Sequence, residues 1–223
     1  MIVVHHLNNS RSQRVLWMLE ELGLDYEIRR YERNAKTMLA PPELKQVHPL
    51  GKSPVITDGP LTLAESGAII EYLVGRYGAG RLAPAAGTLE HVRYLYWLHY
   101  AEGSMMPPLL MRLVFNRLAN GPMPFFIKLI ARKIAQTAND TFVEPNLKLH
   151  LDYLEGELGN NEWFAGKEFS AADIQMSFPL EAARQRAGLN ESRPRLMNFL
   201  QRIHGRPAYL KALERGGKYD LLK

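Results

Sequence analysis

The chain has 223 residues, of which 46% are hydrophobic and 23% are charged, and its formal net charge is +5. These values are typical of a folded globular protein and argue against disorder or a fibrous repeat. The sequence has no cysteine, which excludes disulfides, thiolate metal sites and redox dithiols within the protein and fits a reducing compartment.

The first third of the chain alternates strand-like and helix-like segments. Apolar runs and period-2 patterns indicate strands, whereas Val15, Leu16, Leu19 and Leu22 recur at helical spacing. The predicted elements are strands at 2–7 and 25–31 on either side of a helix at 11–22, a hairpin of strands 54–57 and 61–63 around Asp58-Gly59-Pro60, and a helix at about 65–77. This order, with the first two strands parallel, is that of the thioredoxin fold.

After Gly78 the composition changes. Residues 79–87 are rich in Gly, Ala and Pro and predict a linker, and the later sequence has helical periodicity without clear strand signals. The expected helices are 89–118, kinked at Pro107-Pro108, then 124–158, 171–187, 194–203 and 207–215. The sequence therefore predicts an α/β plus all-α protein: a thioredoxin-like domain at 1–78 and a helical domain at 88–223.

Targeting and charge signals are weak. The N-terminus lacks the basic start, long apolar stretch and cleavage site of a secretory signal, and no apolar run approaches membrane-spanning length, so we expect a cytoplasmic protein without a membrane partner. The positive charge favours small anionic ligands. It is too small and too evenly spread to indicate nucleic-acid binding. The basic group Lys128, Arg132 and Lys133 is expected to be a solvated helix face.

Ser10 stands immediately before the first predicted helix. At an N-cap its hydroxyl would lie beside free backbone N–H groups and the positive end of the helix dipole, where an anion is stabilised. A serine in this position can equally serve only to cap the helix.

Three separated segments together resemble cytosolic glutathione transferases. They are Asn8 to Trp17, His48 to Val55 and Leu63 to Ile69, and in the helical part Phe169 to Ile174 is similar to the capping box of the family's central helix. Within the family, the chain most resembles bacterial and fungal serine-type members. The Ser170–Asp173 box is itself explained by helix initiation, because each residue satisfies the other's backbone donor.

The resemblance implies a glutathione site. Pro54 matches a cis proline of the family, whose geometry lets Ser53 pair with the cysteinyl unit of glutathione. Glu65 and Ser66 open a helix and match the residues that hold the γ-glutamyl ammonium and carboxylate, although both could be simple capping residues. Lys52 resembles a position near the glycyl carboxylate, and its charge sign is right.

The resemblance also implies that one side chain stabilises the glutathione thiolate. Family members use tyrosine, cysteine or serine, but the first tyrosine here is Tyr26 and there is no cysteine. Ser10 is the predicted residue, with Ser12, Asn8 and Asn9 as alternatives. Ser12 lies further into the helix, where its hydroxyl is expected to turn away from the N-terminus. No metal is needed for this chemistry.

The second substrate is poorly specified. By resemblance, four residues of the long helix face the cleft and could form an adaptable apolar pocket, although each could also be a core residue. They are Tyr100, Met105, Met106 and Leu109.

The predicted activity is conjugation of glutathione, as co-substrate, to an electrophilic and apolar small molecule in a detoxification role, by a homodimer. A glutathione-dependent disulfide reductase or peroxidase and a noncatalytic binding domain of the same fold remain alternatives.

Overall fold

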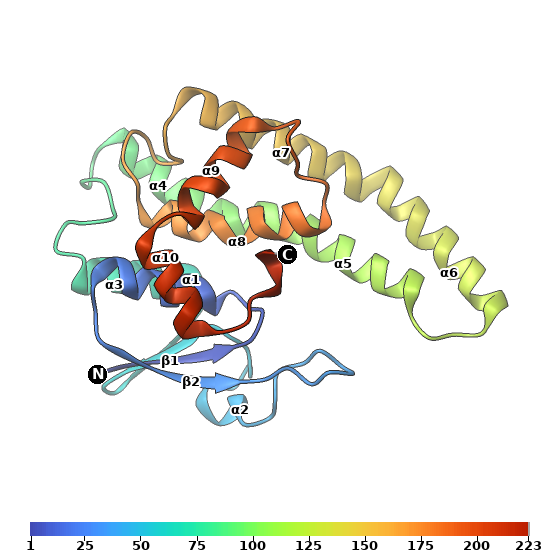
Figure 1. Ribbon diagram of the computed structural model, residues 1–223, viewed down its shortest axis with the longest axis horizontal. Coiled ribbons are helices and arrows are strands. Elements are labelled where there is room, and N and C mark those ends of the chain that lie inside the picture. The colour runs from blue at the N-terminus through green and yellow to red at the C-terminus, as the bar shows by residue number, and fades with distance from the viewer. Residues whose placement is uncertain (223) are drawn as a thin grey trace.

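The N-terminal domain is a four-stranded mixed sheet covered by helices. The computed structural model describes residues 1–222, and the elements of this domain are β1 (Ile2–Leu7), α1 (Ser12–Leu22), β2 (Tyr26–Tyr31), α2 (Leu44–Val47), β3 (Val55–Asp58), β4 (Leu61–Ala64) and α3 (Ser66–Tyr77). The strand order is β2-β1-β3-β4; β1 and β2 are parallel, and β3 is antiparallel to β1 and β4. Helices α1 and α3 lie on one side of the sheet and α2 on the other (Figure 1). The predicted thioredoxin-like domain is confirmed.

The rest of the chain is helical. Its elements are α4 (Leu89–Tyr100), η1 (Ala101–Met105), α5 (Met106–Asn120), α6 (Phe125–Ala138), η2 (Asn139–Val143), α7 (Glu144–Asn160), α8 (Ala171–Arg186), α9 (Pro194–His204), α10 (Pro207–Gly216) and η3 (Asp220–Leu222). Helix α8 lies across α1, while α5 and α6 form a hairpin that extends away from the rest of the molecule (Figure 1). Within residues 1–222, no helix is both long and apolar enough to cross a membrane.

The two long helices differ from their prediction. A five-residue π-helical turn, η1, interrupts the first, and a second one, η2, interrupts the next. Pro107 and Pro108 lie in the first turn of α5, directly after the π turn, so the irregularity predicted at these prolines is found in the five residues before Met106. Residues 89–120 and 125–160 are each one unbroken helical run, close to the predicted bounds, but the helical register changes at the π turns, which the sequence did not predict.

The shorter predicted helices lie within one or two residues of α8, α9 and α10. The capping box is present at the start of α8, where the Asp173 carboxylate accepts from the backbone N–H groups of Ser170 and Phe164 at 2.8 and 2.9 Å. Helix α2 lies between the second predicted strand and the predicted hairpin, where the sequence analysis placed no element.

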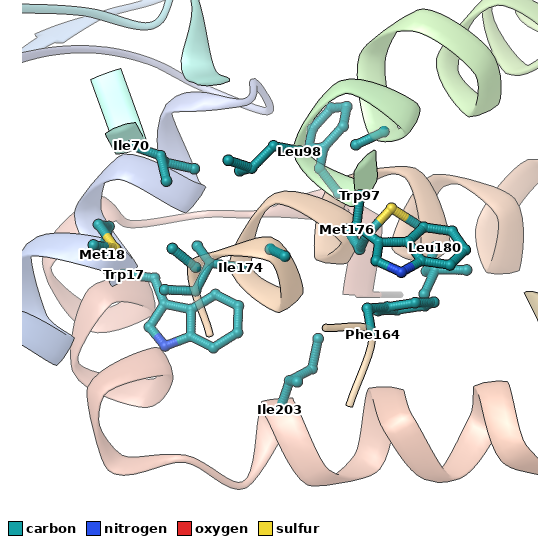
Figure 2. Close-up of a cluster of buried hydrophobic side chains, with 14 of the residues drawn as sticks. Trp17, Met18, Ile70, Trp97, Leu98, Phe164, Ile174, Met176, Leu180 and Ile203 are labelled. Atoms are coloured by element: carbon teal, nitrogen blue, oxygen red, sulfur yellow. The ribbon is translucent and has the colours of Figure 1, made fainter. Parts of the chain in front are cut away.

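One hydrophobic core joins the two domains. Trp17 and Met18 of α1 and Ile70 of α3 belong to the same buried cluster as Ile174 of α8 and Trp97 of α4 (Figure 2). The Trp17 indole is completely buried. Helix α1 is thus held by both domains, so the residues at its N-terminus have a fixed position relative to each of them.

Candidate functional site

A pocket of about 210 Å³ lies where the two domains meet. It is formed by the loop before β3, the junction of β4 and α3, the N-terminus of α1 and the π turn η1. The lining residues are Arg11, His48, Leu50, Lys52, Ser53, Pro54, Ala64, Glu65, Ser66 and Glu102. All five residues predicted to bind glutathione, namely Lys52, Ser53, Pro54, Glu65 and Ser66, are therefore brought together around one pocket.

The loop before β3 presents Ser53 to this pocket. The Ser53–Pro54 peptide bond is cis, as the resemblance implied. The Ser53 hydroxyl donates to the backbone oxygen of His5 in β1 at 3.0 Å, so the loop is tied to the central strand of the domain. Lys52 is exposed beside it.

The junction of β4 and α3 places Glu65 and Ser66. Glu65 has φ 70°, a backbone conformation that non-glycine residues rarely adopt. Such residues cost about 1–3 kcal/mol each and occur where the surrounding structure holds them, frequently at functional sites. Ser66 begins α3 and is buried, whereas Glu65 is exposed at the pocket.

Behind Ser66 lies a buried cation. The Arg14 guanidinium donates to the Ser66 hydroxyl at 2.9 Å, to the Gln175 carbonyl oxygen at 2.6 Å and to the Glu102 carboxylate at 2.5 Å. Arg11 adds a second ion pair to Glu102 at 2.9 Å. This Arg14 cluster, consisting of Arg11, Arg14, Ser66, Glu102 and Gln175, spans α1, α3, η1 and α8.

The electrostatics of the Arg14 cluster favour the ionised carboxylate. Burial by itself raises the pKa of Glu102, but the charges of Arg14 and Arg11 and the hydrogen bonds from them outweigh burial and hold that pKa below its usual value. Burial lowers the pKa of Arg14, which Glu102 opposes. Because an arginine stays protonated in proteins, Arg14 is a buried cation that depends on its acceptors.

Ser10 lies close to the pocket but differs from its prediction in one respect. The N-cap residue of α1 is Arg11, not Ser10, and no side chain caps it. The Ser10 hydroxyl still meets the helix start, because it accepts from the Ser12 backbone N–H at 3.2 Å. It also lies 3.5 Å from the Ser53 hydroxyl oxygen, which lines the pocket.

Ser12 does not turn away from the helix start, contrary to the prediction. It is fully buried, and its Oγ lies 2.7 Å from Ser10 Oγ and 2.8 Å from His6 Nδ1. The two serines and His6 therefore form one hydrogen-bonded chain.

The two asparagines before Ser10 have partners elsewhere. The Asn8 side chain accepts from the Arg33 backbone N–H at 3.0 Å, and Asn9 exchanges two hydrogen bonds with Asp220 in η3. These contacts favour Ser10 or Ser12 over either amide as the group that faces a ligand.

The four residues suggested for a second-substrate pocket are all buried. They belong to the hydrophobic core, which was the alternative role given for each of them in the sequence analysis. None of them lines the pocket of about 210 Å³. They are Tyr100, Met105, Met106 and Leu109.

Sequence reasoning missed Arg11, Arg14 and Glu102. Both arginines lie in the segment that carries the family resemblance, but a charged residue at a helix start does not by itself indicate a buried partner. No sequence pattern indicated that Glu102 contacts α1, because its position depends on the π turn η1.

Comparison with known proteins gives one family for both domains. The model described as glutathione S-transferase, N-terminal domain, matches residues 1–75, and the model for the glutathione S-transferase C-terminal domain matches residues 125–207.

Similar proteins span nearly the whole chain. Glutathione S-transferase 3 of Schizosaccharomyces pombe is 38% identical over 96% of this chain and 88% of its own length. The disulfide-bond oxidoreductase YfcG of Escherichia coli is 30% identical over 96% of this chain and 94% of its own. A crystal structure of a glutathione S-transferase from Actinobacillus pleuropneumoniae is 37% identical, with a TM-score of 0.84, and covers 99% of this chain and 95% of that one.

The Arg14 cluster predicts a pH-dependent loss of stability in Glu102→Gln. Removing the carboxylate leaves Arg14 without its charged partner, and breaking a buried pair costs about 3–5 kcal/mol; because the Glu102 side chain is 31% exposed, we expect the lower part of this range. The folded-state pKa of Glu102 is lowered, so its stabilisation is present at neutral pH and is lost as the pH falls through that pKa.

Urea denaturation at neutral and acidic pH measures this difference. The gap between parent and Glu102→Gln should be largest at neutral pH and should narrow below about pH 4. Glu157→Gln is the matched control, because its ion pair with Arg93 is more exposed on the arginine side and should contribute about 1 kcal/mol or less. Equal losses in the two variants would contradict a special role for the Arg14 cluster.

Proposed function

Because the chain belongs to the glutathione S-transferase family and is a transferase enzyme, we propose that it conjugates the thiolate of glutathione to an electrophilic, apolar small molecule. The observation that carries this proposal is the pocket at the domain junction, which gathers residues from four separate segments. Its side chains offer cations for the carboxylates of glutathione and a carboxylate for its ammonium group.

In the proposed arrangement the γ-glutamyl end of glutathione lies at the start of α3. Arg14 donates to the Ser66 hydroxyl oxygen, so the hydroxyl proton of Ser66 is free to donate to a carboxylate. That proton faces Glu102 at the long distance of 3.4 Å, and a ligand carboxylate can replace this contact. Glu65 receives the ammonium group, and the helix N-terminus adds a positive potential for the carboxylate.

The rest of the tripeptide follows the pocket toward Ser10. The backbone of Ser53, beside the cis Pro54, pairs with the cysteinyl unit, and Lys52 balances the glycyl carboxylate. This placement directs the cysteinyl sulfur to the start of α1, where Ser10 lies 3.5 Å from Ser53.

Thiolate stabilisation by Ser10 is the proposed source of catalysis. A free thiol has a pKa near 8.5, so ionisation at neutral pH needs a shift of about two units, or about 2.7 kcal/mol. A hydroxyl donor to a charged acceptor contributes about 1.5–3 kcal/mol and a helix N-terminus about 0.3–1 kcal/mol. Together they reach the required range. The thiolate then attacks the electrophilic carbon, a sulfur–carbon bond forms, and the leaving group departs with the bonding electrons.

A glutathione-dependent disulfide reductase is the second candidate, because the E. coli relative is named a disulfide-bond oxidoreductase. Since this chain has no cysteine, both reacting sulfurs would have to come from glutathione and the disulfide substrate. Turnover rates with two kinds of substrate separate the two candidates. A transferase should turn over an aryl halide, whereas a reductase should turn over a mixed glutathione disulfide or a peroxide.

We also propose that the protein is a cytoplasmic homodimer with a detoxification role, in keeping with its family and with the frequency of two-fold dimers. Sedimentation velocity at roughly tens of micromolar protein measures the mass of the species in solution and so tests for the dimer. The concentration matters because assembly follows mass action. A single species at the monomer mass would contradict the dimer.

Replacing Glu65 and Ser66 together by alanine should strongly weaken glutathione binding. The variant removes the partner of the ammonium group and a donor to the carboxylate, each worth about 1.5–3 kcal/mol. Isothermal titration calorimetry measures the affinity, and Glu27→Ala, an exposed glutamate on β2, is the control. Unchanged affinity in the double variant would remove this placement of the γ-glutamyl end.

Ser10→Ala should raise the pKa of the bound glutathione thiol by about one to two units and slow conjugation, with little change in affinity. Most contacts with the tripeptide lie elsewhere, so the loss falls on the thiolate. Ser12→Ala should have a smaller effect. Thiolate ultraviolet absorbance against pH measures both variants, and a shift in Ser12→Ala without one in Ser10→Ala would show that the assignment is wrong.

A further inference from the structure

A chain of short hydrogen bonds runs from the start of α1 into the central strand β1. Ser10 Oγ lies 2.7 Å from Ser12 Oγ, and Ser12 Oγ lies 2.8 Å from His6 Nδ1. The Ser12 hydroxyl also makes a longer contact of 3.3 Å with the Leu7 backbone oxygen. All three side chains are buried, with exposed fractions of 4%, 0% and 5% for Ser10, Ser12 and His6. None of them lines the pocket itself, so the chain lies behind it.

Helix α10 holds the His6 ring against this chain. A Cβ on Gly216 would lie 2.7 Å from Gln13 Oε1, 2.9 Å from Leu16 Cδ1 and 3.6 Å from His6 Cε1, so only glycine allows α10 to come this close. The imidazole also borders a separate cavity of about 260 Å³. The charged residues that line this cavity with it are Arg30, Glu32, Lys218 and Asp220.

The His6 ring is neutral at physiological pH. Burial and then the positive charge of Arg30 lower the pKa of His6 to about 4, against a smaller opposite effect of a hydrogen bond that the ring donates to the Gly216 backbone oxygen. A neutral imidazole carries one N–H, on either Nδ1 or Nε2, and the hydrogen bonds of the ring select between them.

We propose that His6 and Ser12 are positioning residues, which act through Ser10 to direct three successive hydrogen bonds at the sulfur of glutathione. This inference rests on the proposed role of Ser10. A thiolate can only accept hydrogen bonds, so it selects the arrangement in which every proton of the chain points toward it. In that arrangement His6 Nδ1–H donates to Ser12, the Ser12 hydroxyl donates to Ser10, and the Ser10 hydroxyl donates to the sulfur. Because a neutral imidazole has a single N–H, the ring gives up its hydrogen bond to the Gly216 backbone oxygen, and the Ser12 hydroxyl gives up its 3.3 Å contact with the Leu7 backbone oxygen.

Ionisation of the thiol does not require the imidazole to take up a proton. The thiol releases its proton to solvent, and the imidazole keeps a single proton, on Nδ1, with no net change of charge on the ring. Because each donor in such a chain is polarised by the donor behind it, Ser10 becomes a stronger donor than an isolated serine. Ser12 is then the second member of the chain rather than a competitor of Ser10.

Two amide substitutions of His6 test this chain. Asparagine places an amide group near the position of Nδ1 and can donate to Ser12, whereas glutamine places its amide near the position of Nε2 and leaves Ser12 without that donor. His6→Gln and Ser12→Ala should each raise the pKa of bound glutathione by about half to one unit, and His6→Asn should leave it within about a quarter of a unit of the parent value. Thiolate ultraviolet absorbance against pH gives these values.

A purely structural role of His6 would not separate asparagine from glutamine. Circular dichroism and the calorimetric affinity for glutathione establish that each variant is folded and binds, and Ser12→Ala tests the chain without changing His6. In Ser12→Ala, adding His6→Gln should cause no further shift of the pKa, because the hydrogen bonds within residues 1–222 connect His6 to Ser10 through Ser12. Equal pKa values in the two His6 variants, or additive shifts, would overturn the proposal.

The same titration separates this inference from the proposed function. If Ser10→Ala raises the pKa but His6→Gln and Ser12→Ala do not, Ser10 acts alone and the chain is overturned while the proposed function stands. If Ser10→Ala has no effect, the thiolate assignment fails, and the chain fails with it.

Discussion

The buried charge of Arg14 is the constraint on which the site depends. A guanidinium in a protein interior is tolerated only where its charge is paired and its N–H groups find acceptors. The two Nη groups of Arg14 find them in Glu102 of η1, the Gln175 carbonyl of α8 and the Ser66 hydroxyl of α3, whereas Nε has no hydrogen-bond partner among the described residues. The position of the helical domain against the sheet domain is thereby coupled to Ser66, which lines the pocket.

The N-terminus of α1 connects two kinds of chemistry. On one side Arg14 reaches α3 and donates to Ser66, which we propose binds the ligand. On the other, Ser12 contacts His6 in β1, which we propose acts on the ionisation of the sulfur. Both depend on a helix that is clamped between domains by Trp17, whose ring packs edge-on against Tyr209 of α10 with centroids 5.0 Å apart. A small rotation of α1 would disturb both networks together.

The π turns explain why a long helix can serve the site. A regular helix from Leu89 onward would carry its residues past α1 in a constant register, whereas η1 inserts one wider turn and brings Glu102 to Arg11 and Arg14. Pro107 and Pro108 then restart the helix as α5, in the positions where proline is best tolerated. Irregular helix geometry is thus part of the contact between domains.

The sequence by itself determined the order of the four strands, the helical character of the later part of the chain and five of the residues that line the pocket. Strand and helix periodicity, Gly and Pro punctuation and the family segments are all local signals, which is why they could be recognised without a structure. The capping box of Ser170 and Asp173 is local in the same way. Tertiary structure alone decided that Glu102 meets Arg14, that Tyr100 and Met105 enter the core, and that Ser12 bonds His6. Those outcomes depend on helix register and on side chains from other elements, which no local pattern encodes.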